Sequence, residues 1–509
     1  MTPAAGDDAR GGELEIGGII AAEPSDLLTR SAFQRDLASQ VALHEYVSLA
    51  DIAHTLVLCE QGVTPADDAK ELLAALLQLH QQIDSFEVDA AGGDLYTNRE
   101  AWLAGRSAAT GWLGYGRARR EPITTGFHIV VLLHALELTE ALGATAGVIA
   151  KVAKAHRNSI FVEHTYLQIA QPTTFGHYLL GFAYPLLRSA ERLREFLARF
   201  DICPAGIGAT NGSPVPQHRG LQASYLGFAA PAPHCRDAMW LADLPLEMAS
   251  SCVATAIALD RLAEDLMVHC SSESGYVTLS DRHCRASKIM PQKRNPFALA
   301  YARAEANKAI GIQASLAAAA RTPSGSMDNR LDAYADVPES ARRVTQVVKL
   351  IGEVCGELQY EERRARLMLA EKSACAADLA ANLSRHTGIS YRRSYRIVGD
   401  VISRCARNGS SLRKLGGDEL WTALCDAVDV EQEGVDREAV QRAIDESFDL
   451  DTCIAARSDV GGAGLGAMQE MLGEVRSAAA AHQRWARGEL AARRGAFKRL
   501  LRRATDLVD

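Results

Sequence analysis

The chain has 509 residues, a net charge of −8 and a pI of about 6.0. This acidic balance gives no general attraction to nucleic acid or to an anionic membrane. The length exceeds one compact core and predicts two or three domains, and the 48% of hydrophobic residues can bury a large interior. Only 6% of the residues are aromatic, while Ala and Leu are frequent. We therefore expect an all-α protein.

Residues 1–25 are acidic, polar and rich in Gly and Ala, so we expect them to be disordered. Two helical patterns follow over 30–90, and a polar, glycine-rich passage covers 90–122. Longer apolar-periodic stretches then predict helices over 126–159, 176–200, 235–272, 296–320 and 337–358. These helices exceed the usual length of about 11–12 residues, which indicates an elongated bundle.

This pattern predicts three helical domains. An N-terminal domain covers 1–122, a central long-helix bundle covers 123–372, and a small domain covers 373–509. The central helices are apolar over more than one stripe, as in His128–Leu138 and Val253–Leu262. One stripe is enough for the core of a monomer, so the surplus predicts burial between subunits. The basic stretch 484–503 is interpreted as a solvated helix face.

The 11 cysteines form no C-x-x-C pair and lie mostly in apolar stretches, which is typical of buried thiols in a reducing cytoplasm. The N-terminus lacks the basic start and apolar core of a signal peptide, and we expect no membrane-spanning segment. We therefore predict a cytoplasmic protein that binds neither nucleic acid nor a membrane. No cluster of metal ligands or nucleotide fingerprint occurs, so we expect no metal and no cofactor.

Residues 282–296 read R-H-C-R-A-S-K-I-M-P-Q-K-R-N-P and carry the strongest chemical signal. Removal of a weakly acidic C–H proton next to a carboxylate needs a strong base, and Ser287 as an alkoxide can supply it. The doubly charged aci-carboxylate that forms needs a fixed cation, Lys293, and an amide donor, Asn295. Asn295-Pro296 also matches the N-cap and first residue of a helix. An ordinary capped connection is the alternative interpretation.

The segment resembles the signature G-S-S-x-M-P-x-K-x-N-P of the aspartase/fumarase superfamily, and its M-P-Q-K-R-N-P form is closest to argininosuccinate lyase. Further stretches resemble the same family: T-Y-L-Q-I-A-Q-P from Thr165, R-F-D-I-C-P-A-G-I-G-A from Arg199, R-L-A-E-D-L from Arg261 and S-F-D-L-D-T-C-I-A-A-R-S-D-V-G-G from Ser447. The resemblance runs from about Ala50 to Gly462. It implies a homotetramer whose active sites are each built from several subunits and act on a small anionic substrate.

Carried over by motif position, the resemblance implies that the residues holding the succinyl half of the substrate are kept. Ser287 matches the base, and Lys293 and Asn295 match the loop cation and amide. The remaining substrate-binding positions are Thr165 and Gln168 of T-Y-L-Q, Arg117 and Arg119 of G-R-A-R, and Asn98. Two carboxylates and a developing carbanion need several such cationic and amide donors.

The other half of the site departs from the family pattern. The general-acid His is replaced by Tyr166, and the Glu that supports it by Ala300. A second active-site His is replaced by Tyr96. The Asn that recognises the arginine moiety is replaced by Arg120. In the segment Met327–Asp336, which corresponds to another arginine-binding motif, only the pair Asn329-Arg330 remains.

These departures predict a leaving group other than arginine, which either needs little protonation or is protonated by Tyr166. Alternatively, Tyr166 and Tyr96 only fill volume that a shorter substrate vacates. Arg120 favours a leaving group with negative charge, unless it faces the surface. We predict a lyase that releases fumarate from an N-substituted aspartate or related succinate by anti β-elimination. Genuine argininosuccinate lyase and a non-catalytic relative, as delta-crystallins are in this family, are the alternatives.

Overall fold

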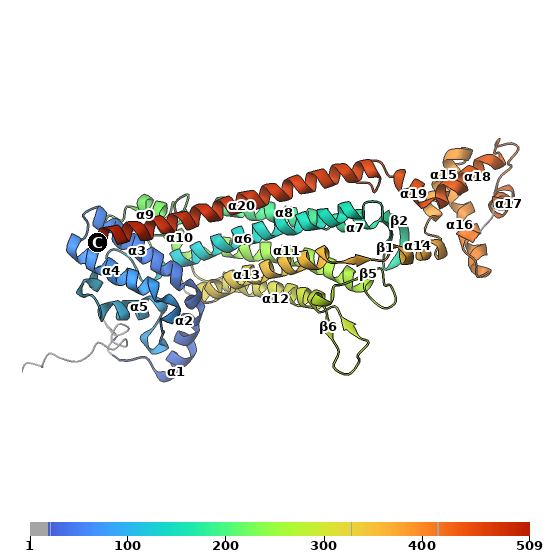
Figure 1. Ribbon diagram of the computed structural model, residues 1–509. Coiled ribbons are helices and arrows are strands. Elements are labelled where there is room, and N and C mark those ends of the chain that lie inside the picture. The colour runs from blue at the N-terminus through green and yellow to red at the C-terminus, as the bar shows by residue number, and fades with distance from the viewer. Residues whose placement is uncertain (1–18, 21, 327, 415–416) are drawn as a thin grey trace, which may run out of the picture.

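The computed structural model describes residues 19–20, 22–326, 328–414 and 417–509. The predicted disorder of 1–25 therefore falls largely outside the described residues. The chain is built from helices with short two-stranded pairs between them, which confirms the all-α prediction. The helices form a long bundle with a helical group at either end (Figure 1).

The N-terminal group packs short helices against one end of the bundle (Figure 1). Its helices are α1 (Asp26–Leu28), α2 (Gln34–Gln40), α3 (His44–Glu60), α4 (Ala66–Gln81) and α5 (Leu95–Ala104). The faces of α3 and α4 supply buried Leu, Val and Ile side chains that continue into the core of the bundle. This end therefore shares one hydrophobic core with the long helices.

The bundle itself consists of long helices that run side by side (Figure 1). They are α6 (Arg120–Ala155), α8 (Ala183–Phe200), α11 (Asp243–His269), α12 (Phe297–Ala319) and α13 (Asp328–Gly356). The stretch predicted as one helix over 235–272 is interrupted, because Leu241 is extended, with ψ 137°, and separates α10 (Cys235–Trp240) from α11. A turn of two residues with helical φ angles, Gly181 and Phe182, separates α7 (Phe175–Leu180) from α8. Apolar periodicity does not record such two-residue breaks.

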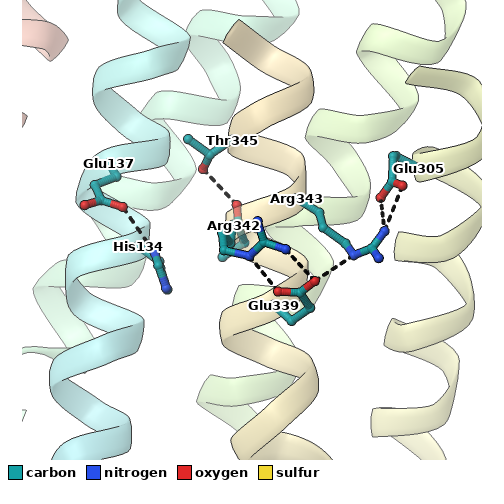
Figure 2. Close-up of polar contacts among 8 residues, drawn as sticks. His134, Glu137, Glu305, Glu339, Arg342, Arg343 and Thr345 are labelled. Atoms are coloured by element: carbon teal, nitrogen blue, oxygen red, sulfur yellow. Dashed lines mark hydrogen bonds and ion pairs between the residues drawn. The ribbon is translucent and has the colours of Figure 1, made fainter. Parts of the chain in front are cut away.

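Ion pairs tie α12 to α13 in the middle of the bundle (Figure 2). The Arg343 guanidinium donates to both oxygens of Glu305, at 2.8 and 3.0 Å, and to Glu339 at 2.8 Å. Arg342 forms a bidentate pair with Glu339, with two contacts of 2.7 Å. Several charges in one network hold their geometry better than an isolated pair does. The network fixes α12, the helix that directly follows segment 282–296.

The last helix, α20 (Leu465–Val508), returns along the bundle and packs against α6 (Figure 1). The two helices approach closely at Gly143, where an added Cβ would lie 2.8 Å from the backbone oxygen of Ala479. Within the predicted solvated stretch 484–503, Arg493 is instead largely buried and pairs with Asp201 at 2.6 Å. The apolar stripe of α20 therefore belongs to the core of the bundle.

A second hydrophobic core lies in the C-terminal helical group. The group comprises α15 (Ala376–Thr387), α16 (Tyr391–Arg407), α17 (Gly417–Ala427) and α18 (Arg437–Phe448), and α14 (Glu362–Glu371) and α19 (Leu450–Ala455) connect it to the bundle. It sits at the end of the bundle opposite the N-terminal helices (Figure 1). The three-domain division stays a prediction, with the qualification that residues 465–508 pack with the bundle and not with this group.

The strands occur as short pairs at the ends of helices. The strands β1 (Ile160–Thr165) and β2 (Gln168–Thr174) form an antiparallel hairpin, and β6 (Arg285–Ala286) pairs antiparallel with β7 (Arg294–Asn295). The strand β5 (Val277–Thr278) pairs antiparallel with β8 (Gln359–Tyr360), and β3 (Ile202–Cys203) pairs parallel with β4 (Ala230–Pro231). The first two pairs carry candidate site residues.

Among the described residues, one helix, α6, is long and apolar enough to cross a membrane by length and composition. This result does not contradict the expectation of no membrane-spanning segment, because a buried core helix passes the same test. In this structure 78% of the most apolar window of α6 is buried inside the protein. Its hydrophobicity therefore serves the core between the neighbouring helices.

Candidate active site

Segment 282–296 forms a loop that stands away from the bundle (Figure 1). The pairs Arg285–Asn295 and Ala286–Arg294 close its base, and Ser287 follows directly after β6. The Ser287 Oγ accepts hydrogen bonds from the backbone N–H of Met290, at 3.1 Å, and of Ile289, at 3.4 Å. Lys293 is exposed on the same loop. Two amide donors on one hydroxyl oxygen favour its deprotonated form, so the local geometry suits a serine base.

Asn295 does not cap the following helix, contrary to the expectation from its sequence. Its side-chain amide donates to the backbone oxygen of Arg285 at 2.9 Å and so closes the base of the loop. The helix α12 begins at Phe297, with Pro296 at the cap position and no side-chain hydrogen bond to the cap. Pairing with Arg285 keeps Asn295 in strand geometry, which is why the capping prediction was wrong.

The hairpin β1–β2 presents Thr165, Tyr166 and Gln168 at its tip. Thr165 pairs with Gln168, and Tyr166 and Leu167 between them have φ angles of 54° and 58°. A two-residue turn with two positive φ angles matches the strand twist, but it is strained for non-glycine residues. The Tyr166 side chain is 99% exposed. Within one chain Tyr166 therefore fills no internal volume.

Arg119 and Arg120 lie at the start of α6, beside two carboxylates that the sequence did not single out. The Arg119 Nε lies 3.5 Å from Asp94 Oδ2, and the Arg120 Nη2 lies 3.6 Å from Asp36 Oδ2. Burial raises the pKa of Asp36 even though the Arg120 charge opposes the rise. The Arg119 side chain is 43% exposed and so remains accessible to a ligand.

Arg117 and Tyr96 lie in the interior of the N-terminal group. The Arg117 Nη2 contacts Asp51 at 2.6 Å, and Arg99 binds the same carboxylate at 2.7 Å. The Tyr96 ring lies beneath the Arg117 guanidinium, and burial raises the pKa of its hydroxyl well above the ordinary range. Substrate contacts by these two residues stay predictions, and their burial favours a structural role.

The Asn98 side chain is hydrogen-bonded to the backbone of its own loop. Its side-chain oxygen accepts from the backbone N–H of Asp89 at 2.7 Å, and its amide donates to the backbone oxygens of Asp89 and Asp94, each at 3.0 Å. An Asn with both ends satisfied by backbone holds a turn together. A role in substrate binding again stays a prediction.

Glu121 anchors the start of α6, and no feature of the sequence singled it out. Its carboxylate accepts the backbone N–H of Gly206 at 2.9 Å and of Gly208 at 2.8 Å. Burial raises its pKa to about 7, against the lowering effects of Arg117 and of these two hydrogen bonds. The sequence held only an indirect sign of this contact. The small residues of A-G-I-G-A allow the backbone to approach a buried carboxylate closely.

Arg330 also lies near the start of α6. It belongs to segment 327–336, which corresponds to the family's second arginine-binding motif. Its Nη2 donates to the backbone oxygen of Met239 at 2.6 Å, and its guanidinium lies over the ring of Tyr334. The Tyr334 hydroxyl lies 2.9 Å from Thr124 Oγ1 on α6. Met327, the first residue of that segment, lies outside the described residues.

One chain does not bring the three groups of candidate residues together. Arg119 directly precedes α6, whose 36 residues span about 54 Å, and Thr165 lies beyond the far end of that helix. The helix α11 ends near the hairpin, where the His269 ring lies 5.2 Å from the Phe161 ring, and the loop with Ser287 follows. Figure 1 shows this loop pointing away from both other groups. A complete site would need residues from more than one copy of the chain.

Comparisons with known proteins show which families this chain is similar to. A family model described as "Lyase" matches residues 24–311. The argininosuccinate lyase of Methanoculleus marisnigri is 32% identical over 462 residues, which cover 89% of this chain and 91% of the relative. The argininosuccinate lyase of Acidothermus cellulolyticus is 31% identical over 409 residues, 79% of this chain and 83% of the relative.

Solved structures share the fold. EDDS lyase in complex with formate superposes with a TM-score of 0.83 at 22% identity and covers 96% of both chains. A class II fumarase from Schistosoma mansoni has a TM-score of 0.66 at 15% identity, over 83% of this chain and 93% of that chain. The family match and the two relatives therefore define the class, the helical lyases of the aspartase/fumarase superfamily, and the solved structures share its fold. Within it, the chain belongs to the argininosuccinate lyase-like family of fumarate-releasing carbon–nitrogen lyases.

Proposed function

We propose that this protein eliminates an amine from an N-substituted aspartate, or a related succinate, and releases fumarate, with Ser287 as the base. The observation that carries the proposal is the environment of Ser287, whose Oγ accepts two backbone N–H groups on an exposed loop that also holds Lys293. These donors stabilise the alkoxide that must form before a carbon acid can lose its proton.

The proposed reaction balances without a cofactor. Ser287 takes the proton from the carbon next to one carboxylate, and the electron pair of the C–H bond moves into an aci-carboxylate. That intermediate collapses to the C=C bond of fumarate while the C–N bond breaks on the opposite face. The departing nitrogen gains one proton from solvent and Ser287 returns its proton to solvent, so the products are fumarate and a free amine and the base is regenerated. Lys293 supplies the positive charge and Asn295 an amide donor for the aci-carboxylate.

Asn295 would have to release Arg285 to bind substrate, because its amide is engaged at the base of the loop. The loop therefore changes conformation when a substrate binds. Such loop closure is a frequent way of completing a catalytic arrangement. Thr165 and Gln168 on the hairpin tip and Arg119 at the start of α6 would hold the carboxylates of the succinyl half.

We further propose that the active enzyme is a homotetramer whose sites combine residues of different chains. The separation of Arg119, Thr165 and Ser287 within one chain supports this assembly, as does the extra apolar surface of the long helices. Large exposed side chains lie along them, among them Ile257 on α11 and Ile310 on α12. Such faces are usually covered by a partner.

Argininosuccinate lyase activity is the second candidate, because the Methanoculleus relative at 32% identity carries that name. Three positions oppose it: Tyr166 and Ala300 replace the family's acid and its supporting carboxylate, and Arg120 replaces an arginine-recognising Asn. A site that lacks the polar partners of its ligand loses about 1–3 kcal/mol for each missing contact. The third candidate, a non-catalytic relative, is opposed by the retained Ser287, Lys293 and Asn295.

The proposal is tested in the addition direction, in deuterated water, with fumarate and a series of primary amines. We expect N-substituted aspartates that carry a single deuterium on the carbon next to the distal carboxylate, detected by mass spectrometry and NMR. Ser287→Ala should lower the rate by at least about a hundredfold. Ser280→Ala is the matched control, because Ser280 precedes the same loop and its side chain caps nothing. Equal rates for wild type and Ser287→Ala would contradict the proposal.

A further inference from the structure

The Glu121 side chain is a buried carboxylate that binds a loop distant in sequence. The residue is 1% exposed. Its Oε1 accepts the backbone N–H of Gly206 at 2.9 Å, and its Oε2 accepts that of Gly208 at 2.8 Å. The Gly208 oxygen in turn accepts the backbone N–H of Ala118 at 3.3 Å. Three hydrogen bonds therefore join the start of α6 to this loop, and the carboxylate charge strengthens two of them.

The backbone of this loop has a shape that glycine adopts more readily than other residues. Gly206 and Gly208 have φ angles of 76° and 68°. Left-handed residues between ordinary ones turn nearby N–H groups toward one point and so form a concavity that binds an anion. Arg219 holds the loop in place, because its Nε donates to the Ala205 oxygen at 3.3 Å and its Nη2 to the Ala232 oxygen at 2.8 Å. The loop is therefore a fixed partner for the Glu121 carboxylate.

Arg119 lies between the two points at which the chain is hydrogen-bonded to this loop. The backbone N–H of Ala118 precedes it and the Glu121 side chain follows it. The Glu121 N–H also donates to the Ala118 oxygen at 3.0 Å, which closes the turn around Arg119. The Arg119 side chain is 43% exposed, with its Nε 3.5 Å from Asp94 Oδ2. The backbone of Arg119 is therefore fixed, while its guanidinium remains accessible to a carboxylate.

The buried Glu121 charge has a cost that packing alone does not require. Burial raises its pKa to about 7, although Arg117 and the two hydrogen bonds lower it. A well-packed apolar residue of similar volume is often as stabilising as a buried charge, or more so. The carboxylate adds direction, because it accepts two N–H groups at fixed positions. This contact favours a role in fixing the local backbone.

We propose that Glu121 is a positioning residue that, through the loop at Gly206–Gly208, holds Arg119 where it binds a carboxylate of the succinyl half. This inference rests on the proposed function, because that function assigns Arg119 to a substrate carboxylate. Arg119 binds this carboxylate in the substrate, the intermediate and fumarate alike. A cation that is already fixed in place loses little conformational entropy on binding. Loss of the Glu121 contact therefore weakens the binding of all three, which raises KM and changes kcat little.

The first experiment measures the addition of a primary amine to fumarate at pH 8, above the Glu121 pKa of about 7, so that the wild-type carboxylate is ionised. Glu121→Gln keeps the shape of the side chain, but its amide group cannot accept from one of the two backbone N–H donors. We expect the KM for fumarate to rise about tenfold or more, and kcat to stay within about threefold of wild type. Glu71→Gln is the matched control and should leave KM unchanged, because the Glu71 carboxylate accepts the backbone N–H of Ala108, at 2.9 Å, elsewhere in the N-terminal group.

A double-mutant cycle tests whether Glu121 acts through Arg119. The Kd of fumarate is measured by NMR titration for wild type, Glu121→Gln, Arg119→Met and the double variant. We expect Glu121→Gln to raise Kd about tenfold in the wild-type background and less than about twofold in the Arg119→Met background. If Arg119→Met binds too weakly to be titrated, Arg119→Lys replaces it, because a flexible ammonium depends less on the backbone than a guanidinium fork does.

The outcomes separate this inference from the proposed function. If circular dichroism shows that Glu121→Gln does not fold, Glu121→Asp, which keeps the charge but is shorter, replaces it in both experiments. Equal factors in the two backgrounds, or an unchanged KM and Kd in the folded Glu121 variant, would overturn this inference while leaving the proposed function intact. A wild type that neither binds fumarate nor adds amines to it would overturn the proposed function, and this inference with it.

Discussion

Tyr166 occupies the position at which the family has its general acid, yet no described residue hydrogen-bonds to its hydroxyl to support proton donation. Its side chain is 99% exposed at the tip of a hairpin, and the family's supporting carboxylate is replaced by Ala300. A tyrosine normally needs a tuned pKa to donate a proton efficiently at neutral pH. We therefore predict that Tyr166→Phe lowers kcat by less than about tenfold, as measured by steady-state fumarate release. A loss of about a hundredfold or more would make Tyr166 the acid.

Glu121 gives a pH dependence whose sign follows from its burial. Its pKa is raised from 4.5 to about 7 in the folded chain, so its contribution to stability is full at low pH and is lost as the pH rises through about 7. From about pH 5 to about pH 8, the free energy of unfolding of the wild type should fall relative to that of Glu121→Gln by about 2.5 kcal/mol. Urea unfolding of both proteins at the two pH values measures this. A constant difference between them would contradict the raised pKa.

Sequence motifs identified candidate residues but not their exposure. Ser287 and Lys293 belong to one sequence motif, and the structure places this motif on a loop between β6 and β7 that stands clear of the bundle. Arg117 matches a family residue and Tyr96 replaces a family His, yet Arg117 contacts the buried Asp51 and the Tyr96 ring lies beneath Arg117. A motif records spacing along the chain, whereas burial depends on residues distant in sequence, such as Asp51. Asp36 and Glu121 were missed for the same reason.

Helix periodicity predicted the long helices well, because each buries a repeating apolar face. It placed their ends less accurately: α6 begins at Arg120 and not near 126, and the stretch 235–272 is divided at Leu241. The positions of these helix ends depend on tertiary contacts. One example is the pair of hydrogen bonds that the Glu121 carboxylate accepts from the backbone N–H groups of Gly206 and Gly208. Periodicity also gave no sign of which helices touch, such as α6 and α20.

The contact between α6 and α20 provides a matched pair of substitutions on one helix. Gly143→Ala would place a Cβ 2.8 Å from the Ala479 backbone oxygen, so we expect a loss of about 1–3 kcal/mol of stability. Gly147→Ala, one turn later, meets no atom within 4 Å and should stabilise the helix by about 0.5–1 kcal/mol. Differential scanning calorimetry should show opposite shifts of Tm. Equal shifts would mean that α20 does not pack at Gly143 as described.

At the scale of the whole molecule, the candidate site is divided among regions that a single chain holds apart. Mixed tetramers test whether different chains complete it. Ser287→Ala and Arg119→Met should each be inactive alone, but co-expressed chains should recover about a quarter of wild-type activity if Ser287 and Arg119 come from different subunits. Fumarate release by the purified mixture measures the recovery.

The control for this experiment mixes Ser287→Ala with Lys293→Met. Both residues lie on one loop of one chain, so every site in these tetramers has a defective loop and no activity should return. Recovery in this control, or none in the test mixture, would contradict a site shared between subunits.

We propose that this lyase releases fumarate from an N-substituted aspartate whose leaving group is not arginine. The most direct measurement compares steady-state fumarate release from argininosuccinate with that from a series of N-alkyl and N-carboxyalkyl aspartates, using one enzyme preparation. We predict a kcat/KM for argininosuccinate that is lower by at least about a hundredfold, because several polar partners of arginine are missing. Turnover of argininosuccinate at an ordinary rate of about ten per second, with none of the other compounds cleaved, would contradict it.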